Sequence, residues 1–134
     1  LTVENDDRAS MWSTQHLYDY IHKDILIPIV HDIHHHRFCP GGLTDQEAMT
    51  LAASTWGDIT PVIHYSESRS IEQNDPKIKP QAHSDYVLDY IDTYGNDVDI
   101  MIEAKHKELA VEKYRQIHLR DAYSDLPSTR SYAS

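Results

Sequence analysis

The chain has 134 residues, which is enough for one ordinary domain and excludes several domains within this sequence. Its 22 acidic and 12 basic residues give a formal net charge of −10, so it cannot bind nucleic acid through an overall positive charge. Carboxylates that hold cations would account for part of this excess. The single cysteine, Cys39, excludes an internal disulfide and favours a reducing compartment, and we find neither a bilayer-spanning apolar run nor a signal peptide.

The predicted elements alternate between strands and helices. Strands are expected at residues 1–3, 25–31, 61–64 and 98–102. Helices are expected at residues 14–23, 45–54, 83–91 and 105–121. Loops are expected at residues 37–42 and 65–82, and a polar tail at residues 123–134. This alternation predicts βαβ units, a parallel sheet and an α/β fold.

Three local features support these boundaries. The run from Ile25 to Val30 is short, β-branched and interrupted by Pro28, which favours a buried strand over a helix. Ser13 is a suitable N-cap for the first helix. The segment Thr44-Asp45-Gln46-Glu47 has the pattern of a capping box for the second helix.

Potential metal ligands follow each predicted strand. They are Glu4, then Asp32 with His35, then His64 with His83 in the following loop, and finally Glu103. In parallel α/β folds the loops after the strands gather at one face, so these side chains are expected to converge. Three carboxylates and three imidazoles exceed one tetrahedral zinc site and suit two or three divalent cations. Such clusters hydrolyse phosphodiesters.

Each residue also has a plainer interpretation. The histidines of residues 31–36 can form a polar surface loop, and His34 or His36 can replace His35 as the ligand. Either Glu4 or Glu103 can be a salt-bridge partner, and His64 can be a hydrogen-bonded core histidine. His83 can belong to a helix start, and His31 can point away from the site because it alternates with Asp32 along a strand.

Six blocks of the sequence resemble the UV damage endonuclease family, in the same order. These are Leu1–Asp6, His31–His36, Thr55–Gly57, Thr60–Ser66, Ala82–Val87 and Met101–Lys105. The resemblance implies a TIM (β/α)8 barrel related to endonuclease IV, of which residues 1–122 would be the C-terminal half, about four βα units. It also implies an enzyme that nicks UV-damaged double-stranded DNA 5′ of the photoproduct, in the cytoplasm, nucleoid or nucleus.

The resemblance further implies a cluster of divalent metals, with manganese expected before zinc or magnesium. Glu4 would bridge two metals, while Asp32 and His35 would ligate separate ones. His64 and His83 would be imidazole ligands, and Glu103 would close the cluster. Of these, Glu4, Asp32, His35 and Glu103 would be the catalytic set.

Two departures from the family pattern stand out. The family usually carries a lysine two residues before the histidine that matches His64, and here that residue is Val62. The family chain is also much longer, so the missing N-terminal half of the barrel would be a required partner and this chain alone is expected to be inactive. The alternative enzyme is a metal-dependent sugar isomerase or epimerase on a similar barrel, and a half-barrel that only binds metal or a partner is the non-enzymatic alternative.

Overall fold

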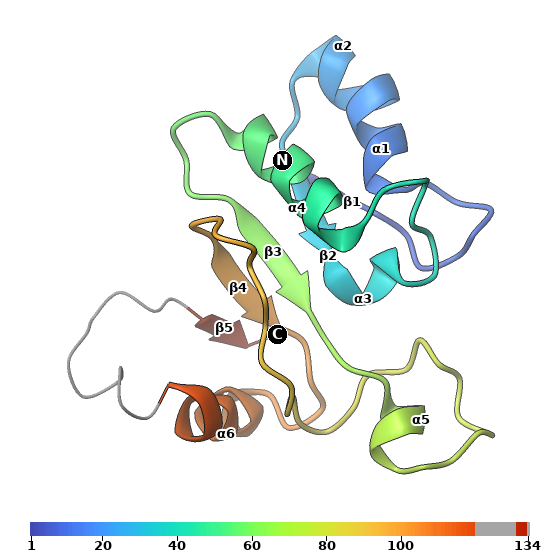
Figure 1. Cartoon of the computed structure of the whole chain (residues 1–134), viewed down its shortest axis with the longest axis vertical. Helices are drawn as coiled ribbons and strands as arrows, with labels where there is room; N and C mark the ends of the chain where they lie inside the picture. Colours follow the sequence, from blue (N-terminus) through green and yellow to red (C-terminus); the bar gives the residue numbers. More distant parts are fainter. Residues whose placement is uncertain (120–130, 134) are drawn as a thin grey trace. The chain divides into compact units, whose positions relative to one another are not determined.

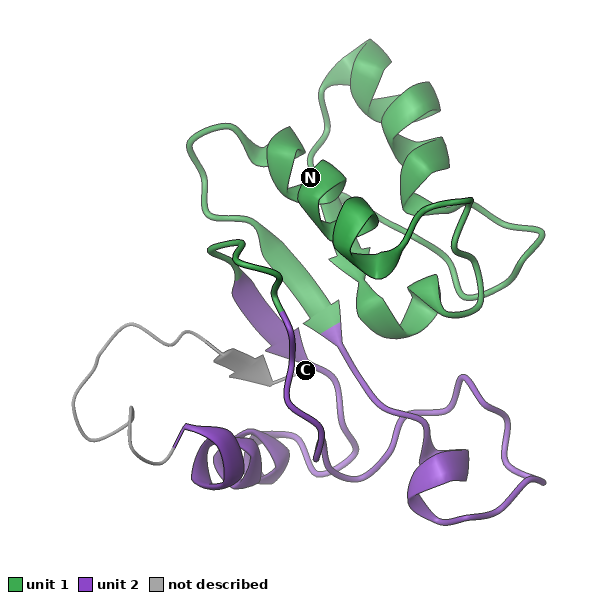
Figure 2. Ribbon diagram, viewed as in Figure 1, with its two compact units in different colours: residues 1–64, 93–98 green, residues 65–92, 99–134 purple. Residues whose placement is uncertain are grey.

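The computed structural model describes residues 1–119 and the backbone of residues 131–133. The chain divides into two compact units, drawn in different colours in Figure 2. Unit 1 comprises residues 1–64 and 93–98, and unit 2 comprises residues 65–92 and 99–134. Each unit is described by itself.

Unit 1 is built on three neighbouring parallel strands, β1 (Val3–Glu4), β2 (Ile29–Asp32) and β3 (Val62–Tyr65). Glu4 is in register with Val30, and Asp32 is in register with His64. Because parallel strands run in the same direction, this register brings their polar carboxyl-terminal residues to one edge of the sheet. The predicted parallel α/β arrangement is confirmed for these strands.

The first helical segment is longer than predicted. It consists of α1 (Thr14–Leu17), the π-helix η1 (Tyr18–His22) and α2 (Lys23–Ile25), and Ser13 caps its start as expected. The predicted strand over residues 25–31 is therefore wrong in its first half. Leu26 adopts a left-handed φ of 58° that ends the helix, and Pro28 then favours extended backbone, so β2 begins at Ile29.

The remaining helices of unit 1 are α3 (Ile33–His36), α4 (Asp45–Ala53) and the short 3-10 helix η2 (Ser54–Trp56). The predicted capping box of α4 is confirmed, because the Glu47 amide donates to the Thr44 hydroxyl and the Thr44 amide donates to the Glu47 carboxylate. Helix α4 packs against β2 (Figure 1). A core of Leu17, Ile29 and Ala52 fills the space between these elements.

Unit 2 contains α5 (Arg69–Glu72), β4 (Asp99–Ile102), α6 (Glu108–His118) and β5 (Ser131–Ala133). Strands β4 and β5 are parallel neighbours. Strand β5 lies within the segment predicted as a polar tail, of which residues 123–130 and 134 lie outside the described part. The last two residues of the predicted helix over 105–121 also lie outside it. The buried apolar side chains of unit 2 include Val87, Ile91, Ile102, Ala110, Val111 and Tyr114.

The predicted helix over residues 83–91 is wrong, since this segment has no helix. The backbone amides of this segment donate hydrogen bonds to carboxylates from elsewhere in unit 2. Glu72 accepts from the amides of Asp85 and Tyr86, and Glu67 accepts from those of Leu88 and Asp89. Backbone groups satisfied by these side chains gain nothing from helical i−4 bonds, so the segment stays irregular.

Among the described residues, every helix is too short or too polar to cross a lipid bilayer.

Candidate metal centre

Three predicted ligands of unit 1 meet at the carboxyl ends of β1, β2 and β3. Glu4, Asp32 and His64 each present a ligand atom within 4.8 Å of those of the other two. His64 Nδ1 lies 2.6 Å from Glu4 Oε2, and both side chains are partly exposed. Burial raises the pKa of Glu4, but the hydrogen bond and charge of His64 outweigh this and hold it below its ordinary value. The arrangement combines two carboxylates and an imidazole, a donor set that suits a divalent cation.

Asp32 is the most unusual of these groups, because its carboxylate is fully buried. Oδ1 accepts a hydrogen bond from the His35 amide at 2.9 Å and so caps α3. Oδ2 makes no hydrogen bond to any described residue; His35 Nδ1 lies 3.5 Å away, and the Glu4 carboxyl is also nearby. Burial, reinforced by the nearby Glu4 charge and opposed by His35, raises the pKa of Asp32 to about 7. A buried carboxylate oxygen without a donor is costly, and a bound cation would relieve that cost.

His35 is held in the tautomer that a metal ligand needs. Its Nδ1 lies 2.7 Å from the carbonyl oxygen of Asn5, which can only accept, so Nδ1 carries the proton. Nε2 is then left with a free lone pair. Burial lowers the pKa of His35, but the charge of Asp32 and the Asn5 carbonyl outweigh this and raise it. An imidazole whose other nitrogen donates to a backbone carbonyl is the usual form of a metal-bound histidine.

The two rival histidines of α3 have structural contacts instead. His34 is buried and its ring lies edge-on to Phe38, with ring centroids 5.2 Å apart. His36 Nε2 donates to the Leu43 carbonyl at 2.9 Å, and burial lowers its pKa. Of the three histidines, His35 is the one whose ring nitrogen approaches the Asp32 carboxylate.

Sequence reasoning did not identify Asn5 as part of the site. The side chain is buried and bridges to the backbone of β2, since Nδ2 donates to the Asp32 carbonyl at 3.0 Å and Oδ1 accepts from the Asp32 amide at 2.8 Å. Its own carbonyl orients His35. Asn5 therefore fixes the Asp32 backbone and orients the His35 ring. In the sequence, the only signal for this role is its position directly after Glu4.

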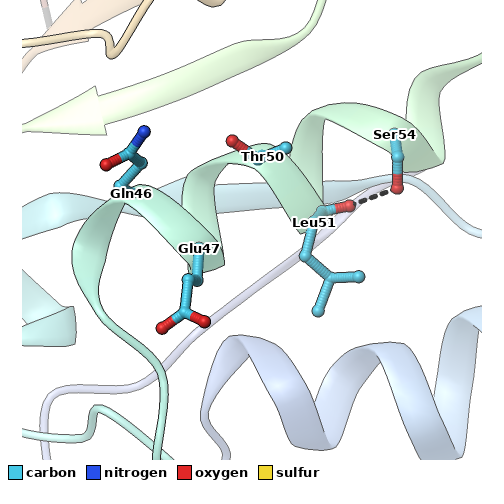
Figure 3. Close-up of a pocket in the computed structure, with 5 residues that line it drawn as sticks. All are labelled: Gln46, Glu47, Thr50, Leu51 and Ser54. Atoms are coloured by element: carbon cyan, nitrogen blue, oxygen red, sulfur yellow. Dashed lines mark hydrogen bonds between the residues drawn. The ribbon is translucent and has the colours of Figure 1, made fainter.

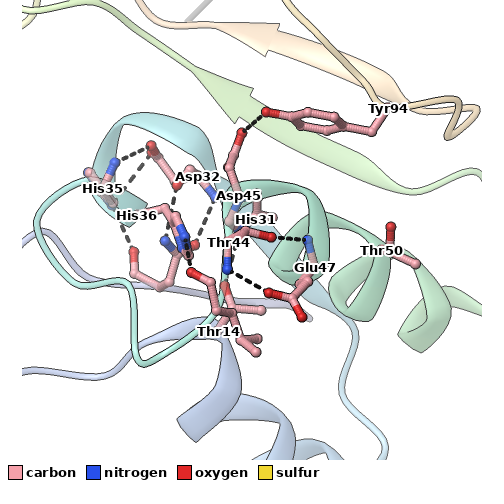
Figure 4. A network of polar contacts seen from close by, with 12 residues as sticks. Thr14, His31, Asp32, His35, His36, Thr44, Asp45, Glu47, Thr50 and Tyr94 are labelled. Atoms are coloured by element: carbon pink, nitrogen blue, oxygen red, sulfur yellow. Dashed lines mark hydrogen bonds and ion pairs between the residues drawn. The ribbon is translucent and has the colours of Figure 1, made fainter.

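His31 alternates with Asp32 along β2 and has different polar partners, which Figure 4 draws together with Asp32 and His35. Its Nε2 lies 2.7 Å from Asp45 Oδ1 and its Nδ1 lies 3.1 Å from Thr14 Oγ1. The hydroxyl of Tyr94 donates to Asp45 Oδ2 at 3.0 Å. Burial raises the pKa of Asp45, but these bonds from His31 and Tyr94 lower it below its ordinary value. The network joins α1, β2, α4 and the residues 93–98, and it leaves His31 unavailable as a metal ligand.

The two predicted ligands of unit 2 also lie near each other. His83 and Glu103 both line a surface cavity of about 360 Å³ within this unit. Glu103 directly follows β4, and its amide donates to the carbonyl of Tyr65, the residue after His64, at 2.9 Å. Both side chains are partly buried.

Val62, which replaces the family lysine, lies in β3 two residues before His64. Residues two apart in a strand face the same side of the sheet, so Val62 and His64 share a face. Its side chain is partly buried.

A second cavity, of about 480 Å³, runs along α4 and is lined by Gln46, Glu47, Thr50, Leu51 and Ser54 (Figure 3). Its one carboxylate, Glu47, is engaged in the capping box. The Ser54 hydroxyl donates to the Leu51 carbonyl at 2.6 Å. The lining of this cavity does not bring several potential metal ligands together, so it is not the candidate metal centre.

Comparison with known proteins gives a consistent picture. The UV-endonuclease UvdE family model matches residues 1–130. The UV-damage endonuclease of Schizosaccharomyces pombe is 40% identical over 122 residues, which are 83% of this chain and 19% of that protein. The UV DNA damage endonuclease of Bacillus mycoides is 32% identical over 123 residues, 83% of this chain and 35% of that protein.

A solved structure is also similar. The crystal structure of SacUVDE matches with a TM-score of 0.71 and 28% identity, over 94% of this chain and 41% of that one. The chain thus spans well under half the length of the relatives that it matches. Since the family model covers nearly all of its residues, the chain belongs to the UV-endonuclease UvdE family.

Proposed function

We propose that this chain supplies the metal-binding part of a DNA repair endonuclease, which nicks the phosphodiester 5′ of UV photoproducts in double-stranded DNA. The observation that carries the proposal is the convergence of Glu4, Asp32 and His64 around a buried, unsatisfied carboxylate oxygen. Membership of the UV-endonuclease UvdE family supports the choice of DNA as the substrate. The partners are UV-damaged DNA and the remaining part of the barrel, and the enzyme works where the cell keeps its DNA.

We assign Glu103 as a further ligand of the same cluster. Its amide is hydrogen-bonded to the carbonyl of Tyr65, and Tyr65 is covalently joined to His64. His83, which lines one cavity together with Glu103, is assigned as an imidazole ligand on the same basis.

His35 is assigned to a second cation beside Asp32. Its Nε2 lone pair is free to bind metal, while Nδ1 is held by the Asn5 carbonyl. With a ligand set of three carboxylates and three imidazoles, the centre holds more than one divalent cation, and manganese is the expected metal, before zinc or magnesium. Such ions supply Lewis acidity for phosphodiester hydrolysis, lowering the pKa of water and neutralising the phosphate charge.

The chain's own residues then have distinct tasks. Glu4 and Asp32 supply negative charge that draws the cations to the ends of the strands, and Asn5 fixes the Asp32 backbone at that edge. Burial of Asp32 keeps bulk water from competing for its oxygens. His64, which lies 2.6 Å from Glu4 through its Nδ1, would hold the cation together with Glu4 and Asp32.

The test uses a chimera in which this chain replaces the matching segment of the Bacillus mycoides relative. The chimera is assayed on UV-irradiated supercoiled plasmid with manganese, with unirradiated plasmid and a chelator as controls. We expect metal-dependent nicking of the irradiated plasmid only, and loss of nicking in the Asp32→Asn variant. A chimera that folds and binds manganese but cuts neither plasmid would refute the proposal.

A further inference from the structure

A group of cationic side chains lies beside Glu103 in unit 2. The cavity of about 360 Å³ that His83 and Glu103 line is completed by Ala104, Lys105 and Lys107. Both lysines are exposed, and neither ammonium group has an acidic partner among the described residues. In a chain of net charge −10, these two lysines place positive charge at one cavity.

The turn that carries these lysines is firmly attached to its neighbours. The Lys105 amide donates to the Ser84 carbonyl at 2.9 Å, and the His106 amide donates to the Asp85 carbonyl at 3.1 Å. The His106 ring also stacks on Tyr86, with centroids 4.8 Å apart. The lysines therefore project from a backbone that is fixed before any ligand arrives, which reduces the entropy lost on binding.

Asp85, whose carbonyl accepts from the His106 amide of this turn, has partners for both carboxylate oxygens. Its Oδ1 accepts a hydrogen bond from Arg69 Nη1 at 2.8 Å, and its Oδ2 lies 3.8 Å from His106 Nε2. The charge of Glu103, the one carboxylate lining the cavity, would be offset by the cation that we assign to it above.

We propose that Lys105 and Lys107 bind a backbone phosphate of the DNA strand beside Glu103. A phosphate oxygen matches the ammonium groups as hydrogen-bond acceptor and as opposite charge. This inference rests on the proposed function, because it places a second phosphate of the same substrate beside Glu103. It adds a DNA-positioning site that carries no information about base sequence or damage.

The experiment measures DNA binding by the chimera at a series of salt concentrations, with Ca²⁺ in place of manganese. Each lysine that neutralises a phosphate contributes about 0.9 to the slope of log affinity against log salt concentration. Lys105→Gln and Lys107→Gln should each make the slope shallower by about 1, and the double variant by about 2. The losses should be equal for irradiated and unirradiated duplexes.

The matched control is the double variant Lys77→Gln/Lys79→Gln. These lysines have the same spacing, are exposed, belong to the same unit and do not line the cavity. We expect this control to leave the slope unchanged. If it changes the slope as much as the cavity pair does, the effect is one of net charge and the inference is overturned.

Two further readouts separate this inference from the proposed function. Manganese content, measured by elemental analysis, should be the same in Lys105→Gln/Lys107→Gln as in the parent. If the parent chimera nicks irradiated DNA but the cavity variants keep its full salt slope, the phosphate site is wrong and the proposed function stands. If the parent neither binds nor nicks DNA, the proposed function itself fails.

Discussion

Two neighbouring residues of β2, His31 and Asp32, lie in opposite polar environments. Both ring nitrogens of His31 have partners, and both carboxylate oxygens of its partner Asp45 are bonded as well. Asp32 is equally buried, yet its Oδ2 has no hydrogen bond to a described residue. A buried network that satisfies itself holds the fold together, whereas a buried acceptor left open is suited to a ligand. On one face of β2, His31 thus makes contacts that stabilise the fold, whereas on the other face Asp32 leaves an acceptor open to a ligand.

The largest effect is expected for metal binding at the Asp32 face. Asp32→Asn removes the charge of a ligand and should weaken manganese affinity at least about 100-fold, which is about 2.7 kcal/mol. Titration calorimetry on the chain measures this directly. The control is Asp58→Asn, an exposed acid with the same change of charge, which should bind manganese as the parent does. Equal affinities for the parent and Asp32→Asn would remove the distinction between the two faces.

On the His31 face the expected effect is on stability. Asp45→Ala leaves a buried imidazole without its acceptor, and it should lower the free energy of unfolding by about 2 kcal/mol. Because Asp45 lies outside the candidate site, manganese binding by the folded fraction should be retained. Urea unfolding monitors the first quantity, with Asp58→Ala as the control. A variant as stable as the parent would show that the network contributes nothing to the fold.

The pH dependence of stability should also differ between the faces. The Asp32 pKa rises from its ordinary value of 3.8 to about 7, so the folded state keeps a proton that the unfolded state releases. The free energy of unfolding of the metal-free chain should therefore fall as pH increases from about 5 to 7, by on the order of 2 kcal/mol. The raised pKa of His35 also lowers the free energy of unfolding as pH rises further. The lowered pKa of Glu4 changes the free energy of unfolding only in acid, where it falls as Glu4 is protonated.

Asp32→Asn should flatten this decline and make the metal-free chain more stable than the parent at pH 7. Urea unfolding at several pH values with a chelator present provides the measurement. A parent chain whose stability increases between about pH 5 and 7 would contradict the assigned environment of Asp32.

The smallest effect is expected at Val62. Val62→Lys adds an ammonium group to the strand face of His64, where it should change the nicking rate of the chimera by up to about tenfold, roughly 1 kcal/mol, and shift its pH dependence. Val62→Met, which is long but uncharged, is the control for size. Identical pH profiles for Val62→Lys and the parent would mean that the departure from the family pattern is neutral.

Local signals in the sequence were reliable where the chemistry is local. The Thr44–Glu47 capping box needs only four consecutive residues, and α4 begins where it predicts. The strand ends at Glu4 and Asp32 were recognisable because apolar β-branched runs stop there. The convergence of these residues with His64 followed from parallel strand order, which the register of β2 and β3 confirms.

The misses have non-local causes. Nothing within residues 83–91 indicates that Glu67 and Glu72 bind its amides and prevent a helix. The role of Asn5 depends on β2, whose partner atoms are 27 residues away in sequence. Likewise His31 could be set apart from Asp32 by strand alternation, but its bond to Asp45 depends on how α4 packs against the sheet.

The central claim is that the polar ends of the parallel strands hold divalent cations. It is tested most directly by anomalous diffraction from crystals of the chain soaked in manganese. We predict a manganese peak roughly 2–2.5 Å from ligand atoms of Glu4, Asp32 and His64, the usual range for carboxylate and imidazole ligands. Ordered manganese found only elsewhere, or none at these side chains under saturating metal, would contradict the account.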